Sequence, residues 1–426
     1  MLGQVMTGVA DSIMVGWTGA VPLAASSLAN SFFGVMLFFG IGVSYAMTPL
    51  VAEASGAKHV NKIIDALRHG LVINVANSLI LVTIIVVGQN ALRHISQPAE
   101  VVELAIPYLL IITYSLIPTM IFQTFRQFAE GLERTRMAMV IMITSNVINI
   151  GLNYLLIYGI WIFPEMGLAG AGWATFISRV VMAVWMVLYV YYGKRFTSYR
   201  DGFKLGNYSR ALFSRMLHIG LPAGAQFIFE AAAFGFSAIM MGWLGATTLA
   251  AHQIAINLAT VSYMTTSGLG AAATIRIGIF FGRRDPVAIQ RAGFTLIGLA
   301  VFIMLLWGVG FVVGKNFLPS LYIDDPGVLA AAVPLMVIAG FFQLSDGMQV
   351  VCAGALRGLQ DVKIPSVMIF VAYWVIALPL GYWLAFKQGF GAIGIWLGLL
   401  IGLTLSAVAM IWRFIYLAKK PMGPVL

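Results

Sequence analysis

The segment MVGWTGAVPLAA at residues 14–25 returns as MMGWLGATTLAA at residues 240–251, and eight of the twelve positions are identical. The two copies begin 226 residues apart. Further matches at nearly the same offset are Gly56-Ala-Lys58 with Gly282-Arg-Arg284 and Gly131-Leu132 with Gly358-Leu359. The similarity therefore runs through each half of the chain, and the sequence predicts an internal duplication.

The composition is too apolar for a water-soluble protein. Apolar residues make up 61% of the 426 residues and charged residues only 9%, against about 45–50% and about 25% in soluble domains. The longest polar segment, residues 193–215, is too short for a soluble catalytic domain. The single cysteine, Cys352, excludes an intramolecular disulfide. No catalytic or metal-ligand spacing is present in the apolar runs, so we expect no enzyme and no cofactor.

Apolar runs of about 18 to 28 residues predict about twelve membrane-spanning helices. The expected spans lie near residues 1–18, 28–52, 67–89, 102–125, 137–160, 166–192, 216–243, 248–275, 292–314, 327–353, 365–386 and 391–412. The fold class is therefore an all-α polytopic membrane protein. Its expected parts are an N-terminal six-helix lobe (1–192), a basic cytoplasmic linker (193–215) and a C-terminal six-helix lobe (216–426).

The repeat also predicts that the first helix is shortened. The residues before Phe227, including Gly220-Leu-Pro222, have no counterpart ahead of Met1. No signal-peptide pattern is present either. We therefore expect either a start upstream of this methionine or a chain that has lost part of its first helix.

Basic residues mark one side of the membrane. The loops after the second, fourth, sixth, eighth and tenth predicted spans, together with the C-terminal tail, hold most of the 25 lysines and arginines. The opposite loops hold only Arg93, Lys315 and Lys387, and Arg179 is the one base that lies away from the ends of a predicted span. This positive-inside pattern predicts that both termini are cytoplasmic. Because the bases are scattered and not clustered, the net charge of +10 does not indicate a nucleic-acid partner.

Away from the ends of the predicted spans, three acids lie within them, namely Asp11, Glu230 and Asp346. A charge at the centre of a membrane helix costs about 2.5–3.5 kcal/mol, so such residues usually have a function. An apolar environment favours the neutral form of a carboxylic acid, and the acid then exchanges a proton or accepts Na⁺. The alternative is that each acid is neutralised by donors on neighbouring helices and only specifies packing.

Amides and a hydroxyl form a second group of candidates. Asn149 and Asn153 are four residues apart on one face of the predicted fifth span, and Thr175 follows in the sixth. Beside Asp11, these oxygens are ligands that a hard cation accepts. Interhelical hydrogen bonding alone explains the same spacing equally well.

Four motifs together resemble the multidrug and toxic compound extrusion (MATE) family, in particular its bacterial NorM-type branch. They are Asp11-Ser-Ile-Met-Val-Gly16, Gly220-Leu-Pro-Ala223 followed by Glu230, Gln343-Leu-Ser-Asp-Gly-Met-Gln349 and Ala355-Leu-Arg-Gly-Leu-Gln-Asp361. The resemblance covers essentially the whole chain apart from its missing start. It implies the fold of the MOP superfamily, in which two six-helix lobes form a central cavity that opens alternately to each face. It also implies export of cationic or amphiphilic compounds driven by inward H⁺ or Na⁺.

The resemblance also assigns sites residue by residue. Asp11, Asn149, Asn153 and Thr175 would form a cation site in the first lobe, and Glu230 with Asp346 a cation and substrate site in the second. Two positions differ from family members: Asn153 replaces an acid found in some relatives, and Phe342 replaces a cation-contacting tyrosine found in some NorM-type proteins. The second difference favours H⁺ over Na⁺ in the second lobe.

The predicted function is a monomeric antiporter in the bacterial cytoplasmic membrane, in which each acid binds either the cation or a positively charged drug. Phe33, Tyr45, Phe229 and Tyr263 are candidates for cation–π contacts with the drug. A flippase or exporter for a lipid-linked or other endogenous metabolite is the alternative in the same superfamily. A flippase for lipid diphosphates would need several bases in the cavity. A channel or receptor does not need acids in both lobes.

Overall fold

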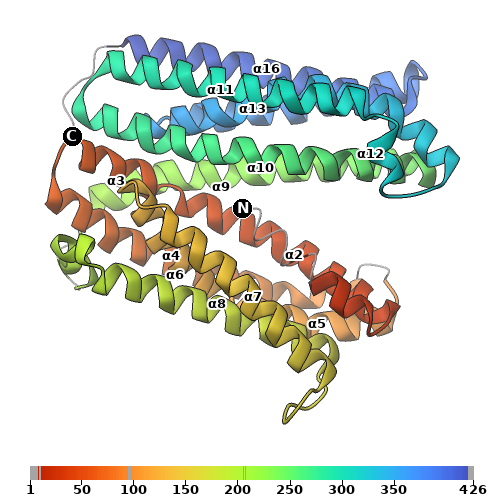
Figure 1. Ribbon diagram of the computed structural model, residues 1–426, viewed down its shortest axis with the longest axis horizontal. Helices are drawn as coiled ribbons and strands as arrows, with labels where there is room; N and C mark the ends of the chain where they lie inside the picture. Colours follow the sequence, from red (N-terminus) through yellow and green to blue (C-terminus); the bar gives the residue numbers. More distant parts are fainter. Residues whose placement is uncertain (1–7, 9–10, 95–96, 205, 207, 421–426) are drawn as a thin grey trace. The chain divides into compact units, whose positions relative to one another are not determined.

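The computed structural model describes residues 8, 11–94, 97–204, 206 and 208–420 (Figure 1). In this part of the chain the elements are helices joined by short connections, without a β-strand. Eleven of the helices there are long and apolar enough to cross a bilayer. The protein is an all-α polytopic membrane protein, which confirms the predicted fold class. The predicted first span, with its expected shortening, lies largely outside the described residues, although residues 11–16 are helical.

Contacts divide the chain into two compact units. Unit 1 comprises Met1–Val51 and Lys58–Gly224, and unit 2 comprises Ala52–Ala57 and Ala225–Leu426. The helices that begin in unit 1 are α2 (Ala20–Ser44), α3 (Met47–Gly56), α4 (Val60–Gly88), η1 (Gln89–His94), α5 (Ala99–Tyr114), α6 (Leu116–Gly131), α7 (Arg136–Tyr158), α8 (Gly167–Tyr192), η2 (Lys194–Phe203) and α9 (Arg210–Trp243). The last residues of α3 and the second part of α9 belong to unit 2.

Unit 2 is organised around one long helix. Its remaining elements are α10 (Ala246–Arg283), α11 (Pro286–Val313), α12 (Phe317–Ser320), α13 (Pro326–Gly358), α14 (Lys363–Phe370), η3 (Val371–Ala377), α15 (Leu378–Tyr382), η4 (Trp383–Lys387) and α16 (Gly391–Lys419). Helix α13 packs against α10, α11 and α16 (Figure 1). This places the middle of α13 in the interior of the unit.

Sequence signals set the beginning of two of these helices. Asp285 and Asp325 each precede a proline at the first helical position, where the missing N–H costs nothing. The Asp285 carboxylate accepts the amide hydrogen of Ala288 at 2.9 Å, and the Asp325 carboxylate accepts that of Val328 at 3.0 Å. Both acids therefore cap the free amides of the first turn.

The internal repeat is visible in the backbone as well as in the sequence. Left-handed φ angles recur at the repeat offset: Gly19 (135°) with Gly245 (119°), Lys58 (58°) with Arg284 (57°), and Glu133 (62°) with Gln360 (63°). The packing repeats too. The Thr48 hydroxyl donates to the carbonyl oxygen of Gln127 at 3.4 Å, and the Thr274 hydroxyl to that of Gly354 at 2.9 Å. The two copies therefore share turns and interhelical contacts as well as helix count.

The ends of α3 and α10 contact each other through repeat-related glycines. A Cβ atom on Gly56 would lie 2.0 Å from the carbonyl oxygen of Ile279, and one on Gly282 would lie 2.0 Å from that of Glu53. Any side chain at either position would overlap the other backbone. This close approach explains why residues 52–57 group with unit 2.

The units and the predicted lobes divide the chain at different residues. The predicted linker and the first part of α9 belong to unit 1. A Cβ atom on Gly42 would lie 2.5 Å from the Cα atom of Gly224, so α9 packs tightly on α2 before it enters unit 2. The boundary between the two compact units, at residues 224 and 225, therefore follows the packing of α9 on α2. The boundary predicted from the sequence followed the basic composition of residues 193–215.

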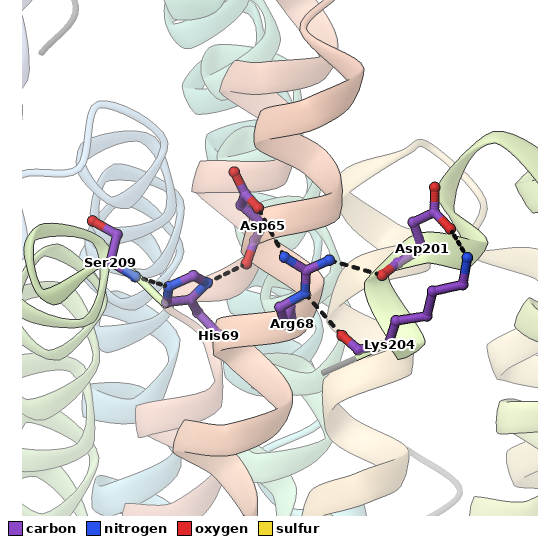
Figure 2. Close-up of polar contacts among 6 residues, drawn as sticks. All are labelled: Asp65, Arg68, His69, Asp201, Lys204 and Ser209. Atoms are coloured by element: carbon purple, nitrogen blue, oxygen red, sulfur yellow. Dashed lines mark hydrogen bonds and ion pairs between the residues drawn. The ribbon is translucent and has the colours of Figure 1, made fainter. Parts of the chain in front are cut away.

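The predicted linker is docked on α4 (Figure 2). Arg68 donates through Nε to the carbonyl oxygen of Lys204 at 2.9 Å, and through Nη2 to that of Asp201 at 3.0 Å. The next residue, His69, accepts the backbone N–H of Ser209 on Nε2 at 2.8 Å. Two consecutive side chains of α4 thus hold Asp201, Lys204 and Ser209 of this segment.

Candidate functional site

The first acid cluster lies within unit 1. Asp11 is in the first described helical turn, Asn149 and Asn153 are on α7, and Thr175 is on α8. All four side chains are buried. The structure therefore brings together the four residues that were predicted for the first lobe. Their role in cation binding stays a prediction.

Hydrogen bonds connect these four residues into one network. The Asn153 amide nitrogen donates to Asp11 Oδ1 and, at 3.4 Å, to Asn149 Oδ1. The Thr175 hydroxyl donates to Asp11 Oδ2 at 3.3 Å and accepts from the Asn149 amide at 3.4 Å. Both carboxylate oxygens of Asp11 thus have a donor, which partly offsets the cost of burying the charge.

One acceptor in this network has no partner. Within the described part of the chain, Asn153 Oδ1 is buried and accepts no hydrogen bond. Buried polar oxygens are nearly always satisfied, so an orphaned one beside a carboxylate indicates room for a further donor or a cation. Asn153 Oδ1 is an oxygen of the type that a hard cation accepts, as are those of Asp11 and Thr175.

Arg179 adds a positive charge that the sequence analysis had recorded only as a lone base. It follows Thr175 by one helical turn on α8, so both side chains are on the same face. Its Nη1 donates to the Ser115 hydroxyl at 2.6 Å, and its guanidinium lies over the Phe33 ring, 4.9 Å from the centroid. It also interacts electrostatically with Asp11. The signal that could have identified it is its four-residue spacing from Thr175.

The second acid cluster lies within unit 2. Glu230 is on the second part of α9, and Asp346 is in the middle of α13. The two carboxyl groups interact electrostatically, so the structure brings together these two predicted residues as well. Two glutamine amides donate to Glu230 Oε1, from Gln349 at 3.1 Å and from Gln226 at 3.4 Å.

Other neighbours of this cluster were not predicted as site residues. The Gln349 amide also contacts the Tyr373 hydroxyl at 3.5 Å, and Tyr373 interacts electrostatically with both acids. Arg357, near the end of α13, interacts with Glu230 in the same way. Gln226 precedes Glu230 by four residues and Gln349 follows Asp346 by three, so helical spacing could have indicated both glutamines.

Phe342 is part of an aromatic group in unit 2. Its ring centroid lies 6.2 Å from that of Phe234 and 6.1 Å from that of Trp396. The side chain is buried and has no hydroxyl group to offer a cation. At this position, where the resemblance implies a tyrosine hydroxyl in some relatives, the chain therefore offers only carbon atoms.

The sequence analysis was incomplete about buried charges. It counted three acids and one base inside the spans, but Glu53, Glu130 and Arg126 also lie in span-length helices with little exposure. Arg126 Nε contacts Glu130 Oε1 at 2.7 Å, and Glu53 accepts the Gln360 side-chain amide. Both acids have polar partners, one across a single helical turn and one across more than 300 residues. Only the first pairing could be anticipated from spacing.

Among the residues that the structure describes, no group of three or more His, Cys, Asp or Glu side chains could hold a metal ion. The clusters combine one or two carboxyl groups with amides, hydroxyls and arginine. Such groups exchange protons or contact Na⁺ through oxygen.

Comparison with known proteins assigns the family. The sequence model of the MatE family matches residues 1–155 and 222–383. The chain belongs to the MatE family. The two matched stretches lie on either side of the predicted linker and correspond to the two copies of the repeat. The match confirms the resemblance drawn from the four motifs.

Full-length relatives of this MatE chain carry the NorM name. It is 33% identical to "Probable multidrug resistance protein NorM" of Rhizobium meliloti over 98% of its own length and 91% of the relative's. It is 34% identical to a protein of the same name from Agrobacterium fabrum, over 99% and 92% of the two chains. "Multidrug resistance protein NorM" of Photobacterium profundum is 32% identical over 97% and 91%.

Solved structures support the same fold for the MatE chain. A crystal structure titled "MATE in the bent conformation" superposes with a TM-score of 0.91 over 98% of this chain and 92% of that one, at 19% identity. A eukaryotic MATE transporter gives a TM-score of 0.85 over 97% and 92%, at 20% identity. At these identities the similarity establishes the fold.

Proposed function

We propose that the chain is a cation-coupled antiporter that exports cationic or amphiphilic drugs and toxic compounds. Inward movement of H⁺ or Na⁺ would drive the export by alternating access. The observation that carries the proposal is that each unit of this membrane-embedded fold contains an acid cluster, around Asp11 in unit 1 and around Glu230 and Asp346 in unit 2. The names of the NorM relatives support drugs as the exported class.

Energetics supports an ion-binding role for these acids. Each ionised side chain at the centre of a membrane helix costs about 2.5–3.5 kcal/mol, and neighbouring donors recover only part of that cost. Asp346 has an acid, Glu230, as its electrostatic neighbour, and two ionised carboxylates at this place repel each other. A proton, Na⁺ or a positively charged drug relieves the repulsion when it binds.

Competition for the acids would couple the two fluxes. A carboxylate that holds the drug is free of the coupling ion, and binding of the ion from outside releases the drug. Exchange of one monovalent ion for one monovalent drug moves no net charge. Exchange of two ions for one drug would also use the membrane potential, about 2.3 kcal/mol per charge per 100 mV.

The proposed setting is the bacterial cytoplasmic membrane, with the chain acting as a monomer. The distribution of lysine and arginine along the sequence supports cytoplasmic termini. In that orientation the docked segment that contains Asp201 and Lys204 faces the cytoplasm, where positively charged loops remain during insertion.

Transport in reconstituted liposomes tests the proposal. We would follow uptake of ethidium, a fluorescent cation, under an imposed H⁺ gradient and separately under a Na⁺ gradient. The proteins would be wild type, Glu230→Gln, Asp346→Asn and the surface variant Asp201→Asn, which serves as a matched loss of one carboxylate. We expect wild type and Asp201→Asn to follow one of the two gradients, and the two cluster variants to lose that dependence.

Two results would contradict the proposal. Ethidium movement that is independent of both gradients would show that transport is not coupled to H⁺ or Na⁺. Absence of ethidium transport, together with transport of a lipid-linked substrate, would favour the flippase alternative.

A further inference from the structure

The connection between α7 and α8 has an apolar tip. It comprises residues 159–166, with the sequence GIWIFPEM, and Figure 1 shows it as a loop that extends beyond the ends of the two helices. Trp161 and Ile162 are each 89% exposed, more than any other large apolar residue that the structure describes. Leaving a large apolar side chain in water instead of burying it costs about 1.5–3 kcal/mol. The pair is therefore suited to an apolar environment.

The loop is closed at its base and strained at its tip. A Cβ atom on Gly159 would lie 2.5 Å from the backbone nitrogen of Glu165, and the Met166 amide donates to the Leu156 carbonyl oxygen at 3.0 Å. The two ends of the loop thus pack on each other. Trp161 has a left-handed φ of 66°, which costs about 1–2 kcal/mol in a residue other than glycine. Strain of this kind is typical of residues with a function.

The membrane-spanning helices place this tip at the surface of the bilayer. Both α7 and α8 are long and apolar enough to span a membrane, so the loop that joins them lies where the spans leave the lipid. The exposed face of α7 is an apolar stripe at helical spacing that ends shortly before the loop, formed by Met139, Ile143, Val147, Ile150 and Tyr154. The apolar surface of α7 therefore continues into Trp161 and Ile162.

The corresponding connection of the second half, between η4 and α16, has a different chemistry. Lys387 and Gln388 are exposed there. Its left-handed positions are glycines, Gly389 with a φ of 76° and Gly391 with a φ of 55°. A loop at this place in the repeat thus does not need an apolar tip, nor a large side chain such as Trp161 in the left-handed conformation. The apolar tip is a property of the first half alone.

We propose that Trp161 and Ile162 anchor the α7–α8 connection in the bilayer interface, between the lipid headgroups and the upper part of the acyl chains. Tryptophan suits this layer because it combines a large apolar body with one N–H donor. The anchor lies at the end of the two helices that carry Asn149, Asn153 and Thr175. The inference depends on the membrane-embedded fold and not on the ion or the substrate of transport.

Fluorescence quenching of the full-length protein in liposomes tests the proposal. In a Cys352→Ala background, Ile162→Cys is labelled with a small fluorophore, and Gln388→Cys on the corresponding loop is the matched control. The quenchers are iodide, present on both sides of the membrane, and phosphatidylcholine that carries a nitroxide near the top of its acyl chain. We expect the nitroxide lipid to quench the probe at residue 162 strongly, and iodide to quench it several-fold less than the probe at residue 388.

Two results would overturn the proposal. Equal quenching by iodide at the two positions would show that the tip faces water. Shielding of residue 162 from both iodide and the nitroxide lipid would show that a second copy of the chain covers the tip.

A variant without a label decides the question if the labelled protein does not fold. Trp161→Phe removes one tryptophan and keeps an apolar ring. The fluorescence that the wild type has in excess of this variant should be quenched by phosphatidylcholine brominated in the upper acyl chain, and absence of that quenching would overturn the proposal. A failed ethidium experiment together with the expected quenching would remove the antiport function and leave the anchor intact.

Discussion

The two acid clusters are on repeat-related halves, yet they are built differently. The first has one carboxyl group, three neutral polar neighbours and a fixed guanidinium, whereas the second has two carboxyl groups and two glutamine donors. At the repeat offsets of 226 and 227, the counterpart of Asp11 is Ser237 and that of Asp346 is Thr119. The duplication therefore kept the helix scaffold and its turns but not the positions of the acids. The two clusters differ in charge because different residues occupy equivalent positions of the repeated helices.

Removing the second pair should have the largest effect on coupling. In the double variant Glu230→Gln/Asp346→Asn, gradient-driven ethidium uptake should fall to the level of protein-free liposomes, because no acid remains in that cluster to exchange the ion. In Arg179→Lys, which keeps the fixed charge, uptake should remain. Gradient-driven uptake that survives loss of both acids would show that the first cluster, and not the second, couples transport to the ion.

Substitution at the repeated glycine contact tests the shared scaffold. Gly282→Ala places a methyl group against the Glu53 carbonyl and should destabilise the protein by about 1–3 kcal/mol. Its repeat mate, Gly56→Ala, should lose a similar amount against Ile279. Gly268→Ala is the matched control, because a Cβ there would meet nothing within 4 Å. The readout is the thermal unfolding midpoint in detergent. Equal midpoints for Gly282→Ala and Gly268→Ala would show that the close approach is not rigid.

Adding an acid to the first cluster should make it resemble the second. Asn153→Asp places a second carboxyl group beside Asp11, and two adjacent carboxylates do not both ionise readily. We expect the infrared absorption of protonated carboxylic acids to increase by about one group at pH 7. Asn153→Leu, which adds no acid, should show no increase. A spectrum unchanged by Asn153→Asp would mean that Arg179 neutralises more than one charge.

The surface pair Asp201–Lys204 should give the smallest effect. The hydrogen bond and the charge of Lys204, at 2.7 Å, lower the pKa of the Asp201 carboxyl. Because the pKa of Asp201 is lower in the folded protein than in the unfolded chain, the pair stabilises the fold at a pH above the unfolded-state pKa. That contribution to the free energy of unfolding is lost as the pH falls through the folded-state pKa. Because both groups are exposed to water, Asp201→Asn should leave the unfolding midpoint at pH 7 unchanged within error. A clear drop would show that this pair helps to hold the linker on α4.

The sequence was sufficient to predict the helical membrane class and the duplication, because apolar run length and self-similarity are local properties of the chain. It also placed Asp11, Asn153 and Thr175 in one site, through helical spacing and the resemblance to a known family. Spacing alone allowed simple hydrogen bonding there, and the structure does show hydrogen bonds. The chemistry of the site is therefore a matter for experiment.

Residues that depend on distant parts of the chain were not found. Glu53 and Gln360 are paired across more than 300 positions, and no pattern in the sequence indicates that contact. Arg179 was noted but not interpreted: its spacing from Thr175 indicates the helix face it shares, but its partners Phe33 and Ser115 are on other helices. The contact boundary at residues 224 and 225 depends on glycine packing between helices, which composition does not reveal.

The most direct test of the account is a measurement of cation release when a drug binds. Ethidium would be added to the purified protein in weakly buffered solution, and released protons and released Na⁺ would be counted against bound ethidium. We expect wild type to release at least one cation per ethidium and Asp346→Asn to release fewer. Ethidium binding to wild type without cation release would contradict competition at the acids and with it the proposed antiport mechanism.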